Sequence, residues 1–427
     1  MEIKLIDIEP RPVWVGHDKR GADYYRAVLP ARMTGGVVKD HITTSAGDLC
    51  DRAALSKIEQ CSTLTISGFG TPTIFLEQWN FESNLRRALA SVPGVIFDWD
   101  DNLLAPDDED LVATREAVIQ SYLIGIATGD SSALENVRGP KMHRFVSDFN
   151  TVFRRRPSEI GEAEALMVIR EQMEKCWPAP DAAIDLWDKM AADRAEVIRT
   201  TPRLIASTPT LARAMRQAAP NADIRIAPNV IDPVDFRRHP KPNDATVRIG
   251  YAATPLHRQD AYLVMPALKK IAALPRTEVW FFGWHPNFYY DFTPALPKQL
   301  EFEGMPYHHG GYICDVKWFH RAIGVLDVTL APLKDTERNR CKSAQKWFES
   351  AMHRTPMVLS DMPPYACVEH GVTGFKASTP EEFTEYALML CTDAALRKRI
   401  GGAAHDAVMA RHTVTSCADV WRAAVAP

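Results

Sequence analysis

Residues 330–361 read LAPLKDTERNRCKSAQKWFESAMHRTPMVLSD, and this stretch decides the fold. An apolar strand ends at Pro332, a polar loop follows, and a helical pattern leads into a second apolar strand after Pro356. Strands that alternate with helices in this way are typical of parallel α/β sheets, in which the loops after the strands carry function. The stretch therefore predicts an α/β fold with a functional loop after Pro332.

Three side chains of the predicted helix share one face. Lys342, Lys346 and Glu349 stand at positions i, i+4 and i+7. Lys342 lies near the helix start, where backbone N–H groups can hold an anion. Glu349 lies two turns deeper, where its carboxylate could accept hydrogen bonds from a ribose diol. This arrangement suits a nucleoside diphosphate, but an ordinary solvated Lys–Glu helix face would have the same spacing.

Further strand patterns lie on both sides of this stretch and fall into two series. The expected strands are Ile3–Ile8, Leu64–Ser67, Val95–Asp98, Leu204–Ser207 and Ile224–Ala227, then Val247–Tyr251, Val279–Phe282, Val325–Leu330 and Met357–Ser360. Between the series, residues 233–243 are polar and contain Pro233, Pro240 and Pro242, as a linker would. We expect a first domain over 1–235, with a helical insertion at about 106–200, and a second domain over 245–405. The segment 406–427 is predicted to be a helix that packs back on the first domain.

The composition fits a globular protein with two cores. The 427 residues are 46% hydrophobic and carry a formal net charge of −4, so no global basic field draws the chain to nucleic acid or anionic membranes. The eight cysteines are scattered and form no Cys-x-x-Cys pair, which argues against a zinc ribbon or a disulfide framework. No stretch approaches the roughly 18 apolar residues that suggest a membrane-spanning helix. No Gly-x-Ser-x-Gly elbow or P-loop indicates hydrolysis.

The stretch 330–361 resembles the C-terminal signature of retaining glycosyltransferase family 4, whose members have the GT-B fold of two Rossmann-like domains facing a cleft. The similarity continues through the Ser-Asp pair at 360–361 and the His-Gly-x-x-Gly turn at 370–374. It implies that Glu349 binds the ribose of a nucleotide-sugar donor and that Lys346 lies in the donor site. The family's second glutamate, eight residues earlier, is replaced by Cys341.

A subgroup of the family with Asn-x-x-Lys-Ser in this loop also lacks that glutamate. Asn339, Lys342 and Ser343 match this pattern, so the resemblance implies that they take over contacts to the sugar or the phosphates.

Other segments match the family in chain order. Residues 227–232 resemble the end of the first domain, and residues 249–260 resemble the start of the second, where the family places a basic residue near the diphosphate; Arg258 or His257 is the candidate. Gly283 ends a strand that would line the base pocket. The segment 16–26, with Gly21, Tyr25 and Arg26, resembles a glycine-containing loop that approaches donor phosphate and acceptor.

The acceptor side is predicted from weaker signals. Asp98, Asp100 and Asp101 form an Asp-x-Asp-Asp motif, which in GT-A glycosyltransferases holds a divalent cation. Because this motif ends a strand of an apparent GT-B first domain, helix capping or an acceptor contact is favoured over a metal site. His143 is a further acceptor-side candidate, although a surface histidine would look the same. Tyr25 and Arg26 complete the acceptor-side set.

The resemblance implies a sugar transfer with retention of anomeric configuration. Arg258 and Lys342 would stabilise the charge that builds on the departing diphosphate, so neither a metal nor another cofactor is expected beside the donor substrate. Closure of the two domains would align the acceptor and exclude water.

The acceptor hydroxyl has two candidate sources. The first is a surface polysaccharide or glycolipid precursor, with the enzyme cytoplasmic and peripheral at the membrane. The second is a hydroxymethylated DNA base, modified in a host cytoplasm by a phage enzyme whose basic run Arg154–Arg156 contacts the DNA. A catalytically silent binding protein, suggested by Cys341, and a sugar-nucleotide 2-epimerase are the alternatives from other classes.

Overall fold

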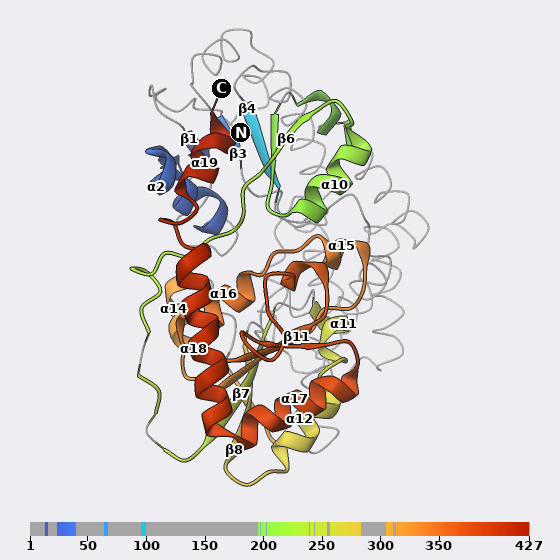
Figure 1. The fold of residues 1–427 in the computed structure, drawn as a ribbon, viewed down its shortest axis with the longest axis vertical. Coiled ribbons are helices and arrows are strands. Elements are labelled where there is room, and N and C mark those ends of the chain that lie inside the picture. Colours follow the sequence, from blue (N-terminus) through green and yellow to red (C-terminus); the bar gives the residue numbers. More distant parts are fainter. Residues whose placement is uncertain are drawn as a thin grey trace, which may run out of the picture.

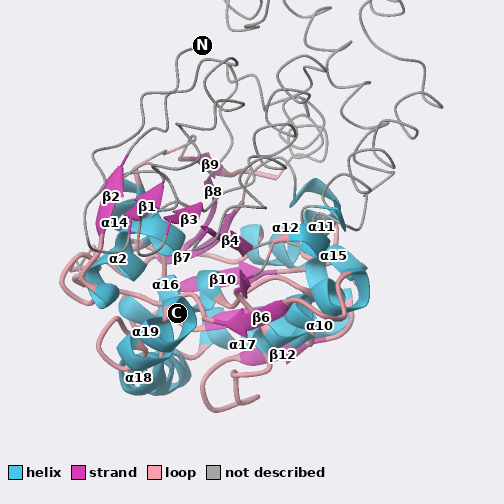
Figure 2. Cartoon of the chain, turned by 90° about the horizontal axis from the view of Figure 1, so that it is seen from above, coloured by secondary structure: helices cyan, strands magenta, loops and turns pink. Residues whose placement is uncertain are grey.

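The computed structural model describes residues 13–15, 24–39, 64–66, 95–99, 195–196, 198–201, 203–238, 240–242, 244–253, 257–282, 305–310, 313 and 315–426. These residues form two six-stranded sheets, and every strand pairing in them is parallel. The sheets lie one above the other in Figure 1. Figure 2 shows the strands in the middle of the molecule with helices on either side. The predicted α/β fold class is confirmed.

The first sheet has the strand order β2-β1-β3-β4-β5-β6. Its strands are β1 (Val13–Val15), β2 (Val37–Lys39), β3 (Leu64–Ile66), β4 (Val95–Trp99), β5 (Arg203–Ala206) and β6 (Asp223–Ile226). A π-helical turn, η1 (Tyr24–Val28), runs directly into α2 (Leu29–Thr34), and α10 (Pro209–Ala218) joins β5 to β6. Helix α10 begins where it does because the Thr208 hydroxyl accepts a hydrogen bond from the Leu211 amide and Pro209 fits the first helical position.

The second sheet has the order β12-β11-β10-β7-β8-β9. Its strands are β7 (Val247–Ala252), β8 (Thr277–Phe282), β9 (His308–His309), β10 (Val328–Ala331), β11 (Met357–Ser360) and β12 (Phe375–Ala377). The order reverses between β7 and β10, so the chain leaves these two neighbours toward opposite edges. That reversal is the place where open α/β sheets bind ligands, beyond the carboxyl ends of the strands.

Helices cover both faces of the second sheet. They are α11 (Arg258–Ala261), α12 (Met265–Ala272), α14 (Val316–Ile323), α15 (Glu337–Arg340), α16 (Gln345–Met352), the 3-10 turn η4 (Pro363–Tyr365), α17 (Pro380–Thr392) and α18 (Ala394–Arg411). All side chains of β10 and β11 are buried, as expected for central strands that are covered on both sides. None of the helices in the described part of the chain combines the length and the apolar character that crossing a bilayer would require.

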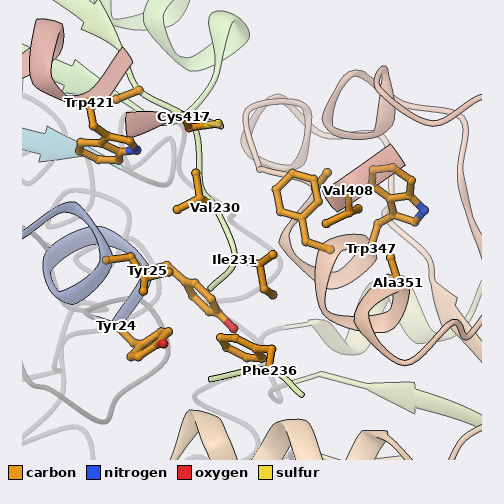
Figure 3. Packing of buried hydrophobic residues seen from close by; sticks show 14 of the residues in the cluster. Tyr24, Tyr25, Val230, Ile231, Phe236, Trp347, Ala351, Val408, Cys417 and Trp421 are labelled. Carbon is orange, nitrogen blue, oxygen red and sulfur yellow. The ribbon is translucent and has the colours of Figure 1, made fainter. Parts of the chain in front are cut away.

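One apolar core continues from the first half into the second. It contains Tyr25 and Ile96 from the first half and Trp347, Ala351 and Val408 from the second. In Figure 3, Val230 and Ile231 of the connecting segment lie between these two groups. A separate core fills the space between the second sheet and helices α12 and α17.

The chain crosses between the halves twice. After α18 it returns to the first half as α19 (Ala418–Val425), which packs against α2, and Trp421 Nε1 donates to the Pro228 carbonyl at 3.0 Å (Figure 1). The two crossings touch, because the Ile231 amide donates to the His412 carbonyl at 2.9 Å and the Val414 amide donates to the Ile231 carbonyl at 3.0 Å.

Several expected elements differ from the structure. The strands β1, β2, β9 and β12, each of two or three residues, were not predicted. The continuous helix expected from Lys342 is wrong: Thr336 caps α15, which ends at Arg340, and Lys342 lies in a turn before α16. The expected strand Ile3–Ile8 and nearly all of the expected insertion at 106–200 lie outside the described residues.

Candidate functional site

The candidate site lies at the reversal of strand order in the second sheet. Two segments meet there: residues 257–260, which follow β7, and residues 332–344, which follow β10 and lead into α16. Because β7 and β10 are hydrogen-bonded neighbours, their carboxyl ends bring both segments to one edge of the sheet.

Asp260 ties the two segments together. Its buried carboxylate accepts hydrogen bonds from His257 Nδ1 at 2.7 Å, the Lys334 amide at 2.6 Å and Asn339 Nδ2 at 3.0 Å. Burial alone would raise the pKa of Asp260, but the hydrogen bond from His257 and the nearby positive charge hold it below its ordinary value. An ionised Asp260 therefore fixes the loop that contains Asn339.

His257 is neutral in this surrounding. Burial lowers its pKa to about 3, and the positive charges of Lys342 and Lys346 add to this effect. A neutral imidazole carries one proton, and Asp260 requires it on Nδ1. The Nε2 atom is then an acceptor, and it faces Lys342 Nζ at 3.3 Å. Asp260 thus acts through His257 to hold the ammonium group of Lys342 in place.

The ammonium group of Lys346 lies near the carboxyl groups of Asp260 and Glu349 but has no hydrogen-bond acceptor among the described residues. Its Nζ atom is buried, has no hydrogen-bond partner among them, and lies 5.5 Å from the ring centroid of Tyr251. Burial lowers the pKa of Lys346 to about 8, and the charge of Lys342 lowers it further still. Two neighbouring ammonium groups, one of them without a hydrogen-bond acceptor, make this a candidate site for an anion.

Glu349 lies on α16 one turn beyond Lys346 and contacts the first half of the molecule. Its Oε1 atom accepts a hydrogen bond from Tyr25 Oη at 2.6 Å, and both residues are buried. Burial raises the pKa of Glu349 to about 7, against the hydrogen bond from Tyr25 and the charge of Lys346. At neutral pH this carboxyl group is close to half protonated.

A second chain of contacts links the loop to the first sheet. Asn229 Nδ2 donates to Ser343 Oγ at 2.8 Å, while Asn229 Oδ1 accepts from Arg26 at 3.0 Å. Arg26 in turn forms a bidentate pair with Asp98 and donates to the Ala227 carbonyl at 2.7 Å. The loop is therefore held from both halves of the molecule.

Cys341 points inward at the position of the missing glutamate. The residue is buried, and its carbonyl accepts a hydrogen bond from the Thr208 hydroxyl at 2.8 Å. Its backbone thus joins the loop to the start of α10.

The architecture is similar to that of known protein structures, although the sequence matches none of the protein families or curated proteins. Among solved structures, HepE of Anabaena in complex with UDP-glucose matches with a TM-score of 0.55 and 12% identity, over 96% of this chain and 97% of that one. The sucrose-phosphate synthase of Thermosynechococcus elongatus matches with a TM-score of 0.56 and 10% identity, over 96% of both chains.

The chain has the GT-B fold. Its candidate site therefore lies in the C-terminal half of a GT-B protein, next to the interface with the N-terminal half. The structure brings five of the predicted residues together there: Asn339, Lys342, Ser343, Lys346 and Glu349.

The predicted acceptor-side residues occupy different surroundings. Arg26 and Asp98 are 1% and 2% exposed and bind each other beneath the surface of the first half. Tyr25 donates a hydrogen bond to Glu349 of the other half. Helix α11 begins at Arg258, but the side chain of Arg258 lies outside the described residues, as do Gly21, Asp100, Asp101, His143 and Gly283. Within the described ranges, no three His, Cys, Asp or Glu side chains gather in a way that could hold a metal ion.

Asp260 and Thr208 were not predicted as site residues, and Asn229 was matched only as part of the segment 227–232. Asp260 ends the segment 249–260, three residues after His257, and an acidic residue at that spacing on a short helix could have indicated a contact. No sequence pattern indicates the contacts of Thr208 and Asn229, because their partners lie 133 and 114 residues away.

Proposed function

We propose that this chain is a glycosyltransferase that moves a sugar from a nucleoside-diphosphate donor to an acceptor hydroxyl. The buried and unpaired Nζ of Lys346, beside Lys342 at the reversal of strand order, is the observation that carries the proposal. A diphosphate supplies two adjacent negative charges and several acceptor oxygens, which two neighbouring ammonium groups can bind.

The donor we propose is a UDP-sugar. HepE, which shares the fold, was solved with UDP-glucose, and this makes UDP-glucose the first donor to test. In our proposal Glu349 binds the ribose, while Asn339 and Ser343 contact the sugar or the phosphates. Gly283 would lie near the base, and Gly21 near the phosphates.

The proposed reaction proceeds with retention, as in family 4 enzymes of the Asn-x-x-Lys-Ser subgroup. Negative charge builds on the diphosphate as the sugar departs, and Lys342, Lys346 and Arg258 would stabilise it. His257 is neutral and would serve to orient Lys342. The lysines supply the positive charge at the leaving group, so the proposal includes no metal ion or other cofactor.

For the acceptor we propose a surface glycan or a glycolipid precursor, used in the cytoplasm at the membrane surface. Hydroxymethylated DNA is the second acceptor to assay once the donor is known. A silent binding protein is distinguished by donor hydrolysis, because an enzyme slowly releases nucleoside diphosphate without acceptor.

The proposal is tested by thermal shift with a panel of UDP-, GDP-, ADP- and TDP-sugars. A ligand at about 100 times its dissociation constant stabilises the folded state by roughly 2.7 kcal/mol, which a melting curve resolves. We expect UDP-glucose or another UDP-sugar to stabilise the wild type, and Glu349→Ala to lose most of this shift. Glu385→Ala, which removes an exposed carboxylate on α17, is the matched control. A wild type that no nucleotide stabilises would contradict the proposal.

A further inference from the structure

The contact between Tyr25 and Glu349 joins two distant parts of the chain at the donor site. The two residues are 324 positions apart, one on η1 of the N-terminal half and one on α16 of the C-terminal half. The 2.6 Å separation of Tyr25 Oη and Glu349 Oε1 is short, as expected for a hydroxyl that donates to a carboxylate.

Tyr25 packs against aromatic rings of η1 and of the connecting segment. Its ring stacks on Phe236 with centroids 6.1 Å apart and meets Tyr24 edge to face at 5.4 Å. Figure 3 shows Tyr25 reaching from η1 toward Phe236. Tyr24 is fixed in turn by a hydrogen bond to Asp235 of the connecting segment. A move of Tyr25 is therefore a move of η1 and its neighbours.

Tyr25 occupies one oxygen, Oε1, of the Glu349 carboxylate while this contact persists. Only 8% of the residue is exposed, and its carboxylate lies among Tyr25, Gln345 and Lys346. Gln345 and Lys346 share α16 with Glu349 and move with it. Tyr25 is the one of these three neighbours that belongs to the other half, so withdrawal of Tyr25 opens the carboxylate.

We infer that Tyr25 occupies the place of the donor ribose on Glu349 and thereby sets the affinity of the site for the donor. The inference rests on the proposed function. A phenol and a ribose hydroxyl are both O–H donors, and each satisfies the same buried acceptor. The empty enzyme keeps Glu349 satisfied through Tyr25, and the donor exchanges its own hydroxyl for that of Tyr25 as η1 moves away. The apparent dissociation constant is then the intrinsic constant divided by the fraction of the protein in the open form.

Removal of the Tyr25 hydroxyl tests the inference. We expect Tyr25→Phe to bind UDP about tenfold more tightly than the wild type, measured by isothermal titration calorimetry, since the closed empty form loses its hydrogen bond. Tyr24→Phe is the matched control: it removes the same group from the neighbouring residue, whose hydroxyl contacts Asp235, and its affinity for UDP should stay within about twofold of the wild type.

The outcomes separate this inference from the proposed function. If UDP binds the wild type and Tyr25→Phe equally, or binds Tyr25→Phe more weakly, the competition is wrong while the donor site stands. If UDP and the other nucleotides bind neither protein, both fail.

A measurement on the wild type covers the case in which Tyr25→Phe does not fold. UDP should speed the hydrogen exchange of amides 24–28, because Tyr25 leaves its buried place. Slower exchange of these amides with UDP would overturn the inference.

Discussion

Two buried positive charges lie in opposite halves of the molecule and differ in how many hydrogen-bond partners surround them. The guanidinium of Arg26 pairs with Asp98, donates to Asn229 and the Ala227 carbonyl, and stacks over Trp421 with its Cζ 4.6 Å from the ring centroid. The ammonium of Lys346 has a ring beside it and a second lysine nearby, but no hydrogen-bond partner among the described residues.

The difference separates structural charge from functional charge. A buried charge that is fully paired contributes to the specific arrangement of the fold. Its removal leaves the partner charge buried without a counter-charge, which destabilises the folded state. A buried charge without a partner is costly in the empty protein, and it is tolerated where a ligand supplies the missing acceptor. Arg26 belongs to the first kind, and we propose that Lys346 belongs to the second.

The largest effect is expected from breaking the satisfied pair. Arg26→Met should lower the free energy of unfolding by about 3–5 kcal/mol, because Asp98 is left buried without its partner. Urea denaturation measures the loss. The control is Arg203→Met, which removes a partly exposed pair with Asp223 and should cost at most about 1 kcal/mol. Equal losses in the two variants would show that the Arg26 pair is no more structural than a surface pair.

A smaller effect is expected from the pH dependence of Glu349. Its pKa is about 7 in the folded protein and 4.5 ordinarily, so between these values the folded state keeps a proton that the unfolded chain has lost. This carboxyl group therefore makes stability fall as the pH rises from 4.5 to 7, and the loss persists above pH 7. Glu349→Gln removes this titrating group, so the stability of the variant relative to the wild type should rise by about 3 kcal/mol as the pH goes from 4.5 to 7.

Urea unfolding at several pH values measures this difference. The opposite trend caused by His257, whose pKa is lowered to about 3, is present in both proteins and cancels. A difference between Glu349→Gln and the wild type that does not change with pH would show that Glu349 is ionised throughout.

The smallest effect on stability, and the largest on binding, is expected from substituting Lys346, whose ammonium group has no hydrogen-bond partner among the described residues. Lys346→Met should raise the free energy of unfolding by on the order of 1–2 kcal/mol below pH 8, because a costly buried charge is removed. Above pH 8 the gain should shrink, since the folded wild type is then neutral at this residue while its unfolded chain still carries the charge.

The same variant should bind UDP-glucose at least about tenfold more weakly. Lys270→Met, on the exposed face of α12, is the control for both measurements and should change neither. A loss of stability in Lys346→Met would place Lys346 with Arg26 among the structural charges.

The sequence was informative where apolar runs are long. The buried strands β10 and β11 and the strand β7 give clear patterns, and Met357–Ser360 was predicted with its observed bounds. The cluster of Lys342, Lys346 and Glu349 was anticipated from helical spacing, although Lys342 reaches it from a turn because the contact of Asn339 with Asp260 holds the preceding loop.

The contacts that the sequence did not predict depend on how the two halves pack against each other. The contact of Tyr25 with Glu349 and that of Asn229 with Ser343 join segments with no common periodicity, and their chemistry shows only when both sheets are placed. The neutral state of His257 likewise follows from burial and from two lysines that lie 85 and 89 positions further along the chain.

The paired crossings at Ile231 and at residues 412–414 limit how the halves can move. Two crossings joined by hydrogen bonds define one hinge axis between the halves. A single crossing would allow the halves to rotate in any direction. Sliding or twisting of the halves would shear these bonds, but rotation about the hinge axis leaves them intact. In our proposal the two halves open by rotation about these joined crossings, and this rotation separates Tyr25 from Glu349.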